Sequence, residues 1–166
     1  MSLTAKITAA VRATKTGSAD LPTVNAAYNE KAELSLTNGT GSGQADLIWS
    51  DTRTLAASAT ENLDLAGGLT DEFRTALTFV EVVAVYVKAA SANTNDVLFG
   101  GAASNGFSTP FGDASDVVKI KPGGVLLLTN PVGYGVTAST GDILKMANSS
   151  SGSSVTYDII VVGRSA

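Results

Sequence analysis

Apolar and polar residues alternate along most of this chain, and that period of two constrains its fold more than any other feature. Successive side chains of a β-strand point to opposite faces, so a strand with one buried face shows this alternation. It is present in residues 6–14, 31–37 and 155–162. Only residues 70–74, a threonine cap followed by two acidic residues, favour a single helical turn. The sequence therefore predicts an all-β protein with negligible helix.

Turn-forming residues divide the chain into roughly nine or ten short strands, spaced as in sandwiches and barrels. For example, Pro122, Gly123 and Gly124 separate residues 117–121 from residues 125–129. Proline followed by glycine suits a tight reversal, because proline sets φ for the first central position and glycine tolerates a positive φ. With 166 residues and no cysteine, the chain can form one core without disulfides. We therefore expect a β-sandwich of jelly-roll type.

The first 25 residues differ from the rest of the chain. One plausible strand is followed by a stretch that contains Gly, Ser and Pro but lacks long apolar residues that could anchor it in a core. Such segments stay mobile unless tied down, and they can order on a partner. We predict a strand or arm at residues 1–25 that contacts a partner through Ile7 and Val11, and a β-sandwich domain at residues 26–166. The alternative is that Ile7–Ala13 is an ordinary outer strand.

Two strands carry more apolar surface than one core needs. Residues 79–87 are apolar on both faces except at Glu81, and Ile160 and Val162 make the second face of the last strand apolar at its end. A strand of this kind lies in the interior of a sheet, or its outer face is covered by another subunit. The sequence therefore predicts a homo-oligomer, with Ile160 and Val162 among the residues that contact a partner.

Three aromatic residues, Phe107, Phe111 and Tyr134, lie in glycine-rich loops. If exposed, they could stack on a sugar or fill a pocket on a neighbour, and we include them among the candidate partner-contact residues. The alternative, which we favour, is that they fold back over the ends of the sandwich.

The residue types that most enzymes and metal sites need are missing or scattered. Without histidine and cysteine the chain has no Ser-His-Asp triad and no imidazole or thiolate metal ligand. Paired carboxylates remain as a route to glycosidase chemistry. The candidate pairs are Glu30 with Glu33, Glu61 with Asp64, Asp71 with Glu72, and Asp113 with Asp116. Because each pair lies at a turn or strand end, where acidic residues commonly cap and solubilise, we expect no catalytic residues.

We also expect no cofactor and no metal. Residues 93–96 and 113–116 offer oxygen ligands of the kind that bind calcium, but Asn and Asp also favour turns for backbone reasons. The net charge of −4 and the absence of any run of Lys or Arg argue against nucleic acid or a membrane surface as partner. No window is apolar enough for a membrane span, so we expect a soluble protein.

Four segments carry a resemblance to a known class of proteins. They are SDTRTLAASATENLDLAGGLTD (residues 50–71), NTNDVLFGGAASNGFSTPFGD (93–113), DVVKIKPGGVLLL (116–128) and GYGVTASTGDILKMANSSSGSSVTYDIIVVG (133–163). Together they resemble structural proteins of tailed bacteriophages and prophages. None of the four is a catalytic motif, and the first forty or so residues take no part in the resemblance.

The resemblance implies a role for the chain. Small jelly-roll virion proteins of this kind act as capsid decoration, or cement, proteins, commonly as trimers on the head lattice. It therefore implies a virion protein, assembled in the bacterial host cytoplasm, whose partners are the major capsid protein or another virion protein and copies of itself. The alternatives are a receptor- or glycan-binding knob of a phage fibre or tail and, more distantly, a carboxylate-based glycosidase.

Overall fold

The computed structural model describes residues 2–166, and every regular element in that range is a β-strand. The strands are β1 (Ala5–Ser18), β2 (Thr23–Asn38), β3 (Gln44–Ala45), β4 (Leu47–Leu55), β5 (Thr60–Asp64), β6 (Leu69–Thr70), β7 (Ala76–Leu77), β8 (Glu81–Ala89), β9 (Val97–Gly100), β10 (Val117–Ile120), β11 (Val125–Gly135), β12 (Ile143–Asn148) and β13 (Val155–Arg164). The all-β prediction is confirmed. None of the described residues belongs to a helix of the length and apolarity that crossing a membrane requires.

The strand count and the helical turn differ from expectation. Three of the 13 strands, β3, β6 and β7, have only two residues each, too few to produce an alternation that a sequence would reveal. Of the residues expected to form the helical turn, Thr70 ends β6 and residues 71–74 form a turn before β7. The Asp71 side chain accepts the backbone N–H groups of Phe73 and Thr75, so it organises that turn and does not start a helix.

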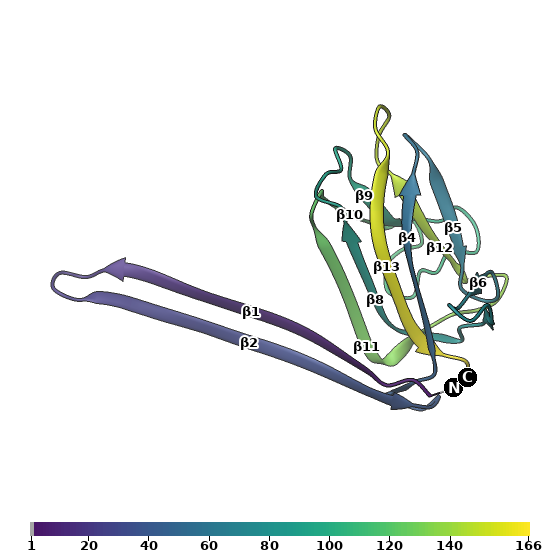
Figure 1. Ribbon diagram of the computed structural model, residues 1–166, viewed down its shortest axis with the longest axis horizontal. Helices are drawn as coiled ribbons and strands as arrows, with labels where there is room; N and C mark the ends of the chain where they lie inside the picture. The colour runs from purple at the N-terminus through teal and green to yellow at the C-terminus, as the bar shows by residue number, and fades with distance from the viewer. Residues whose placement is uncertain (1) are drawn as a thin grey trace.

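Two four-stranded antiparallel sheets face each other in a β-sandwich arrangement (Figure 1). The first, which we call the long sheet, has the order β11-β8-β13-β4, and the second, the short sheet, has the order β10-β9-β12-β5. In the long sheet, β8 and β13 are central and pair along almost their whole length. A central strand is covered on both faces more readily than an edge strand, so the apolar runs of β8 and β13 are consistent with this position.

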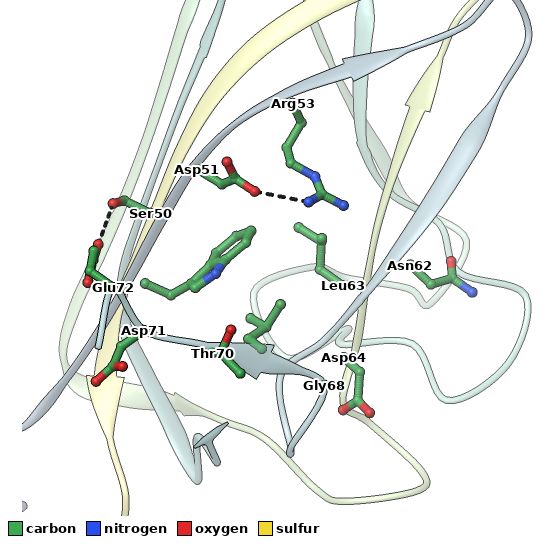
Figure 2. A pocket seen from close by; sticks show the side chains of 12 residues that line it. Ser50, Asp51, Arg53, Asn62, Leu63, Asp64, Gly68, Thr70, Asp71 and Glu72 are labelled. Atoms are coloured by element: carbon green, nitrogen blue, oxygen red, sulfur yellow. Dashed lines mark hydrogen bonds and ion pairs between the residues drawn. The ribbon is translucent and has the colours of Figure 1, made fainter. Parts of the chain in front are cut away.

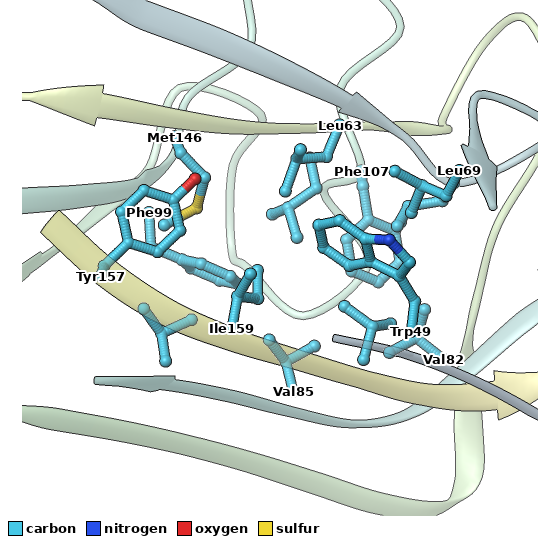
Figure 3. Close-up of a cluster of buried hydrophobic side chains, with 14 of the residues drawn as sticks. Trp49, Leu63, Leu69, Val82, Val85, Phe99, Phe107, Met146, Tyr157 and Ile159 are labelled. Carbon is cyan, nitrogen blue, oxygen red and sulfur yellow. The ribbon is translucent and has the colours of Figure 1, made fainter. Parts of the chain in front are cut away.

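The main core lies between the two sheets and consists of alternate residues from their inner faces (Figure 3). Val85, Val87 and Ile159 come from the long sheet, and Phe99 and Met146 come from the short sheet. All five side chains are almost completely buried. Burying an aliphatic or aromatic side chain of this size contributes about 1.5–3 kcal/mol, so this core is the main source of the sandwich's stability.

A long two-stranded hairpin, β1 and β2, projects from one end of the sandwich (Figure 1). Its strands pair without a break from Ala5 opposite Leu36 to Ser18 opposite Thr23. The turn at its tip is short, and the Ala19 N–H donates to the Pro22 carbonyl at 3.0 Å. Both chain ends lie at the root of the hairpin, whereas the loop between β12 and β13 lies at the opposite end of the sandwich (Figure 1).

The projecting segment does not end at the predicted boundary between residues 25 and 26. That boundary falls inside β2, because residues 31–36 of the alternating stretch pair with β1, and Thr37 pairs with Gln44 of β3. The part of the chain that projects therefore extends to Asn38 and not to Asn25. The expected loop at residues 17–25 is reduced to the turn at the tip, since Gly17 and Ser18 still pair with Val24 and Thr23.

Candidate partner-binding surface

A second, smaller hydrophobic cluster joins the root of the hairpin to the outer face of the long sheet. Its buried members are Leu36, Ala45, Val83, Ala84 and Val162, and Leu3, Ala5, Ile7, Leu34 and Ile48 pack against it. The hairpin root therefore covers, within one chain, part of the second apolar face of β8 and β13 that suggested another subunit. Val162 is only 5% exposed, which corrects its assignment as a free partner-contact residue.

Arg164, whose side chain is only 1% exposed, bonds to the loop that joins the hairpin to the sandwich. Its Nη1 donates to the carbonyls of Gly41 at 2.7 Å and Pro131 at 3.3 Å, and its Nη2 donates to the Val132 carbonyl and pairs with Glu81. A buried charge is tolerated only when it is paired and hydrogen-bonded in this way. These bonds tie the loop that follows β2 to β8 and β11.

Close approach of the Arg164 guanidinium depends on a glycine in β11. Gly133 has a φ of +97°, and a Cβ at this position would lie 2.5 Å from Nη2 of Arg164. Only glycine meets both requirements without strain. Nothing in the sequence marked Arg164, because a single arginine near the end of a strand has no periodicity or motif that distinguishes it.

Beyond its root, the hairpin has one apolar and one polar face. Residues directly opposite each other in an antiparallel pair share a face, so the register assigns each side chain. The apolar face, which we call the arm face, consists of Ala9, Val11, Ala13, Val24, Ala26, Tyr28 and Ala32. Val11 is 66% exposed and Tyr28 is 56% exposed. The opposite face carries Thr8, Arg12, Thr14, Thr16, Lys31 and Glu33, among others.

The outer face of the long sheet carries a second apolar surface, the sheet patch, formed by Ile48, Tyr86, Leu127 and Ile160 together with Ala84 and Val162, which are buried beneath the hairpin root. These six residues line a groove of about 410 Å³ beside the hairpin root, together with β1 residues that include Ile7. The register places Leu127, Tyr86 and Ile160 in one row across three strands. Tyr86 and Leu127 are half-buried, and Ile160 is 36% exposed.

The structure therefore brings together three of the predicted partner-contact residues, Ile7, Ile160 and Val162, at this groove. Val11 lies farther out, on the arm face. The hairpin diverges from the long sheet beyond its root (Figure 1), and its side chains from Thr8 to Glu33 are exposed. An isolated two-stranded hairpin is marginally stable in water. A partner that covered the arm face would supply the burial that the hairpin lacks.

The three aromatic residues pack onto the sandwich, which is the arrangement that we favour, but Tyr134 lies in β11 and not in a loop. Phe107 is buried in the main core, and Phe111 and Tyr134 are half-buried against it. The rings of Phe99 and Phe111 lie 5.6 Å apart between centroids. A Cβ at Gly100 would lie 2.7 Å from the Phe111 ring, so glycine makes room for it. The assignment of Phe107 as a partner contact is therefore wrong, and Phe111 and Tyr134 present only part of their surface.

A polar pocket of about 470 Å³ lies where β4 and β5 meet the β6 segment (Figure 2). Its carboxylates are engaged in local structure. Asp64 accepts the Ala66 N–H at 2.9 Å, Glu72 accepts the Ser50 hydroxyl at 3.0 Å, and Asp51 pairs with Arg53 at 2.9 Å. Trp49 lies beneath the pocket and belongs to the main core.

Glu61, next to this pocket, accepts the hydroxyl of the buried Tyr157 and pairs with Arg53 at 2.6 Å. Burial, and then the hydrogen bond to Glu61, raise the pKa of Tyr157 above its ordinary value. The hydrogen bond to Glu61 also raises the pKa of Arg53. This carboxylate therefore supplies a buried phenol with an acceptor and a guanidinium with a counter-ion.

Of the other candidate carboxylates, Glu33, Asp113 and Asp116 have structural partners, and Glu30 has none within residues 2–166. Glu30 and Glu33 lie on opposite faces of the hairpin, and Glu33 pairs with Lys31 and Lys6, which lower its pKa. Asp113 accepts the hydroxyl and the N–H of Ser115, which lower its pKa, and Asp116 accepts the Asp113 N–H.

The asparagines of residues 93–96 hold neighbouring segments together. Asn93 bonds both backbone groups of Thr156, and Asn95 donates to Asn148 and to the carbonyls of Ser150 and Ser153. Within residues 2–166, no group of three or more acidic side chains is placed to hold a metal ion.

No protein-family model matches this chain, and comparison with curated proteins finds no match.

Proposed function

We propose that this chain is a structural protein of a tailed-phage virion, and specifically a homo-oligomeric decoration protein that binds the head shell. The observation that carries the proposal is the projecting hairpin, because it presents a long apolar face that nothing in the chain covers. A fold that presents such an arm from a stable sandwich suits assembly. The major capsid protein is the proposed partner in the particle, and the sequence resemblance supports the same setting.

The strand order supports a jelly-roll sandwich as part of this proposal. The eight longer strands of the sandwich are β4, β5, β8, β9, β10, β11, β12 and β13. Counted in chain order, they follow 6-3-8-1 across the long sheet and 5-4-7-2 across the short sheet. Two interleaved Greek keys of eight strands have this kind of order.

A second candidate is a receptor- or glycan-binding knob of a fibre or tail. The polar pocket favours it, since Asn62, Asp64 and Asp71 offer hydrogen-bonding groups of the kind that sugars need. Copy number separates the two candidates, because a decoration protein approaches the abundance of the major capsid protein and a fibre does not.

The proposal is tested with particles of the source phage from which this protein has been removed. Wild-type protein should bind them at a copy number comparable with the capsid protein, measured by quantitative mass spectrometry. A shortened hairpin, with Ala10–Lys31 replaced by an Asn-Gly turn, should keep the sandwich and lose binding. Equal binding by the shortened variant, or a copy number of only a few per particle, would overturn the proposal.

A further inference from the structure

The chain carries two apolar surfaces that begin in contact and then separate. At the hairpin root, Ile7 and Leu34 pack against the cluster that contains Ala84 and Val162 of the long sheet. The hydrophobic contact between hairpin and sheet is therefore already present within one chain. Farther out, the hairpin diverges from the long sheet (Figure 1). Ala9 and Ala32, at the inner end of the arm face, still line a small cleft with Leu127, whereas the arm face beyond them, with Val11 and Tyr28, is exposed.

We infer that the arm face of one copy packs across the sheet patch of a neighbouring copy. This arrangement extends the apolar contact of the hairpin root to the parts of both surfaces that one chain leaves uncovered. The inference deepens the proposed function by naming what the arm binds, but the contact concerns only copies of this chain and can be measured without the particle.

Charge supports a second copy as the occupant. Two charged residues, Lys15 and Glu30, interrupt the otherwise apolar hairpin face, and neither is paired within residues 2–166. On the long sheet, Lys88 and Asp158 lie directly opposite each other in the strand register, in the row next to Tyr86 and Ile160. Each surface thus presents one positive and one negative side chain, and Glu30, which lies directly opposite Val11 in the hairpin face, can meet Lys88 of a neighbouring copy.

The surface area that each arrangement would bury favours an exchange, in which each copy's arm face covers its neighbour's sheet patch, over an arrangement in which two arm faces cover each other. Nine residues of a two-stranded ribbon measure roughly 30 Å by 10 Å, so one face buries on the order of 600 Å² in total when covered. A specific interface needs about 1,200–2,000 Å². Two hairpins packed face to face would bury this area once and leave both sheet patches exposed. In an exchange, each copy gives one arm and receives another, which doubles the area per copy.

The absence of cysteine allows a direct crosslinking test. In the double variant Val11→Cys with Ile160→Cys, mild oxidation should give disulfide-linked oligomers at multiples of 16.8 kDa on a non-reducing gel. The matched control is Thr14→Cys with Ile160→Cys, because Thr14 is also exposed but lies on the opposite face of the hairpin. It should give at least fivefold less crosslinked product. Equal crosslinking in the two, or none in either, would overturn the inference.

Single variants separate the other arrangements. If Val11→Cys alone gives as much dimer as the double variant, the arms pair with each other and the inference is wrong. Light scattering gives a second readout: wild type should have a multiple of the 16.8 kDa mass, Val11→Lys should be monomeric, and Thr14→Lys should match wild type. Circular dichroism checks that each variant is folded. A monomeric wild type that still binds particles through its hairpin would refute this inference but not the proposed function. An arm-exchanged oligomer that does not bind particles would refute the proposed function but not this inference.

Discussion

The sandwich and the hairpin both consist of paired antiparallel strands, but only the sandwich buries its side chains within the chain. Tyr157 and Val161 in β13 are almost completely buried, whereas Val11 and Tyr28 in the hairpin are more than half exposed. Backbone pairing is continuous in the hairpin and between β13 and β4 of the sandwich. Since a hydrogen bond contributes only about 0.5–1.5 kcal/mol net, the comparison shows that pairing defines the shape of a strand pair and burial supplies most of its stability.

The largest expected effect of a single substitution is in the main core. Phe99→Ala removes a fully buried ring that packs against Phe111, and it should lower the free energy of unfolding by about 3–5 kcal/mol. Urea denaturation followed by tryptophan fluorescence measures this, because Trp49 lies in the same core. The hairpin counterpart, Val11→Ala, measured at protein concentrations too low for association, should change stability by less than about 0.5 kcal/mol. Similar losses in the two variants would mean that the hairpin is buried in solution.

The next effect concerns the join between the two regions. Arg164→Met keeps an unbranched stem like the aliphatic part of arginine but removes the guanidinium and every hydrogen bond that Arg164 donates to the carbonyls of Gly41, Pro131 and Val132. We expect a loss of about 2–3 kcal/mol. Hydrogen exchange should increase in residues 39–45, the loop between hairpin and sandwich. Glu81→Gln is the control, and it should cost less because Glu81 is partly exposed and the arginine keeps its carbonyl partners. Unchanged exchange in residues 39–45 would show that Arg164 does not hold the hairpin.

A smaller effect appears at alkaline pH. Tyr157 has a raised pKa in the folded protein, so between its unfolded and folded pKa values the folded state binds more protons. Its contribution is fully present below the unfolded pKa of about 10 and falls as pH rises above it, by about 1.4 kcal/mol per pH unit. Above pH 9, the unfolding free energy should therefore fall less steeply with rising pH for Tyr157→Phe than for wild type. Denaturation curves recorded at several pH values measure this. Identical pH slopes would count against this burial.

The smallest effect should come from shortening the hairpin. With Ala10–Lys31 replaced by an Asn-Gly turn, the root cluster with Ile7 and Leu34 is retained. At protein concentrations too low for association, the unfolding free energy should change by less than about 1 kcal/mol, because the removed side chains are exposed. Thermal denaturation of the dilute protein measures this. A large loss would show that the hairpin contributes to the stability of the single chain.

The sequence predicted the sandwich better than the hairpin, for physical reasons. Alternation shows that one face of a strand is buried, and it correctly placed Tyr157 and Ile159 on the buried face of β13. Alternation does not identify what covers that face. Residues 31–37 alternate as a core strand would, yet residues 31–36 pair with β1, and only Leu34 and Leu36 reach a hydrophobic cluster.

The candidate site shows the same limit at the level of single residues. Ile160 and Val162 are equivalent in the sequence, but Val162 lies under the hairpin root and Ile160 lies outside it. The pairing of β1 with β2 begins at Ala5 opposite Leu36. That contact, together with Arg164, determines how much of the outer face of the long sheet the hairpin root covers. The position of the root depends on tertiary contacts that no local sequence pattern encodes.

The two ends of the sandwich face opposite ways, and this has a practical consequence for attaching cargo. The hairpin and both termini lie at one end, and the serine-rich loop at residues 149–154 lies at the other (Figure 1). A peptide fused to either terminus would emerge beside the arm and compete for space with whatever the arm binds. A peptide inserted at Ser151, which is exposed, would instead be displayed away from that contact. For a protein bound through its arm, this loop is therefore the natural position for an epitope or affinity tag.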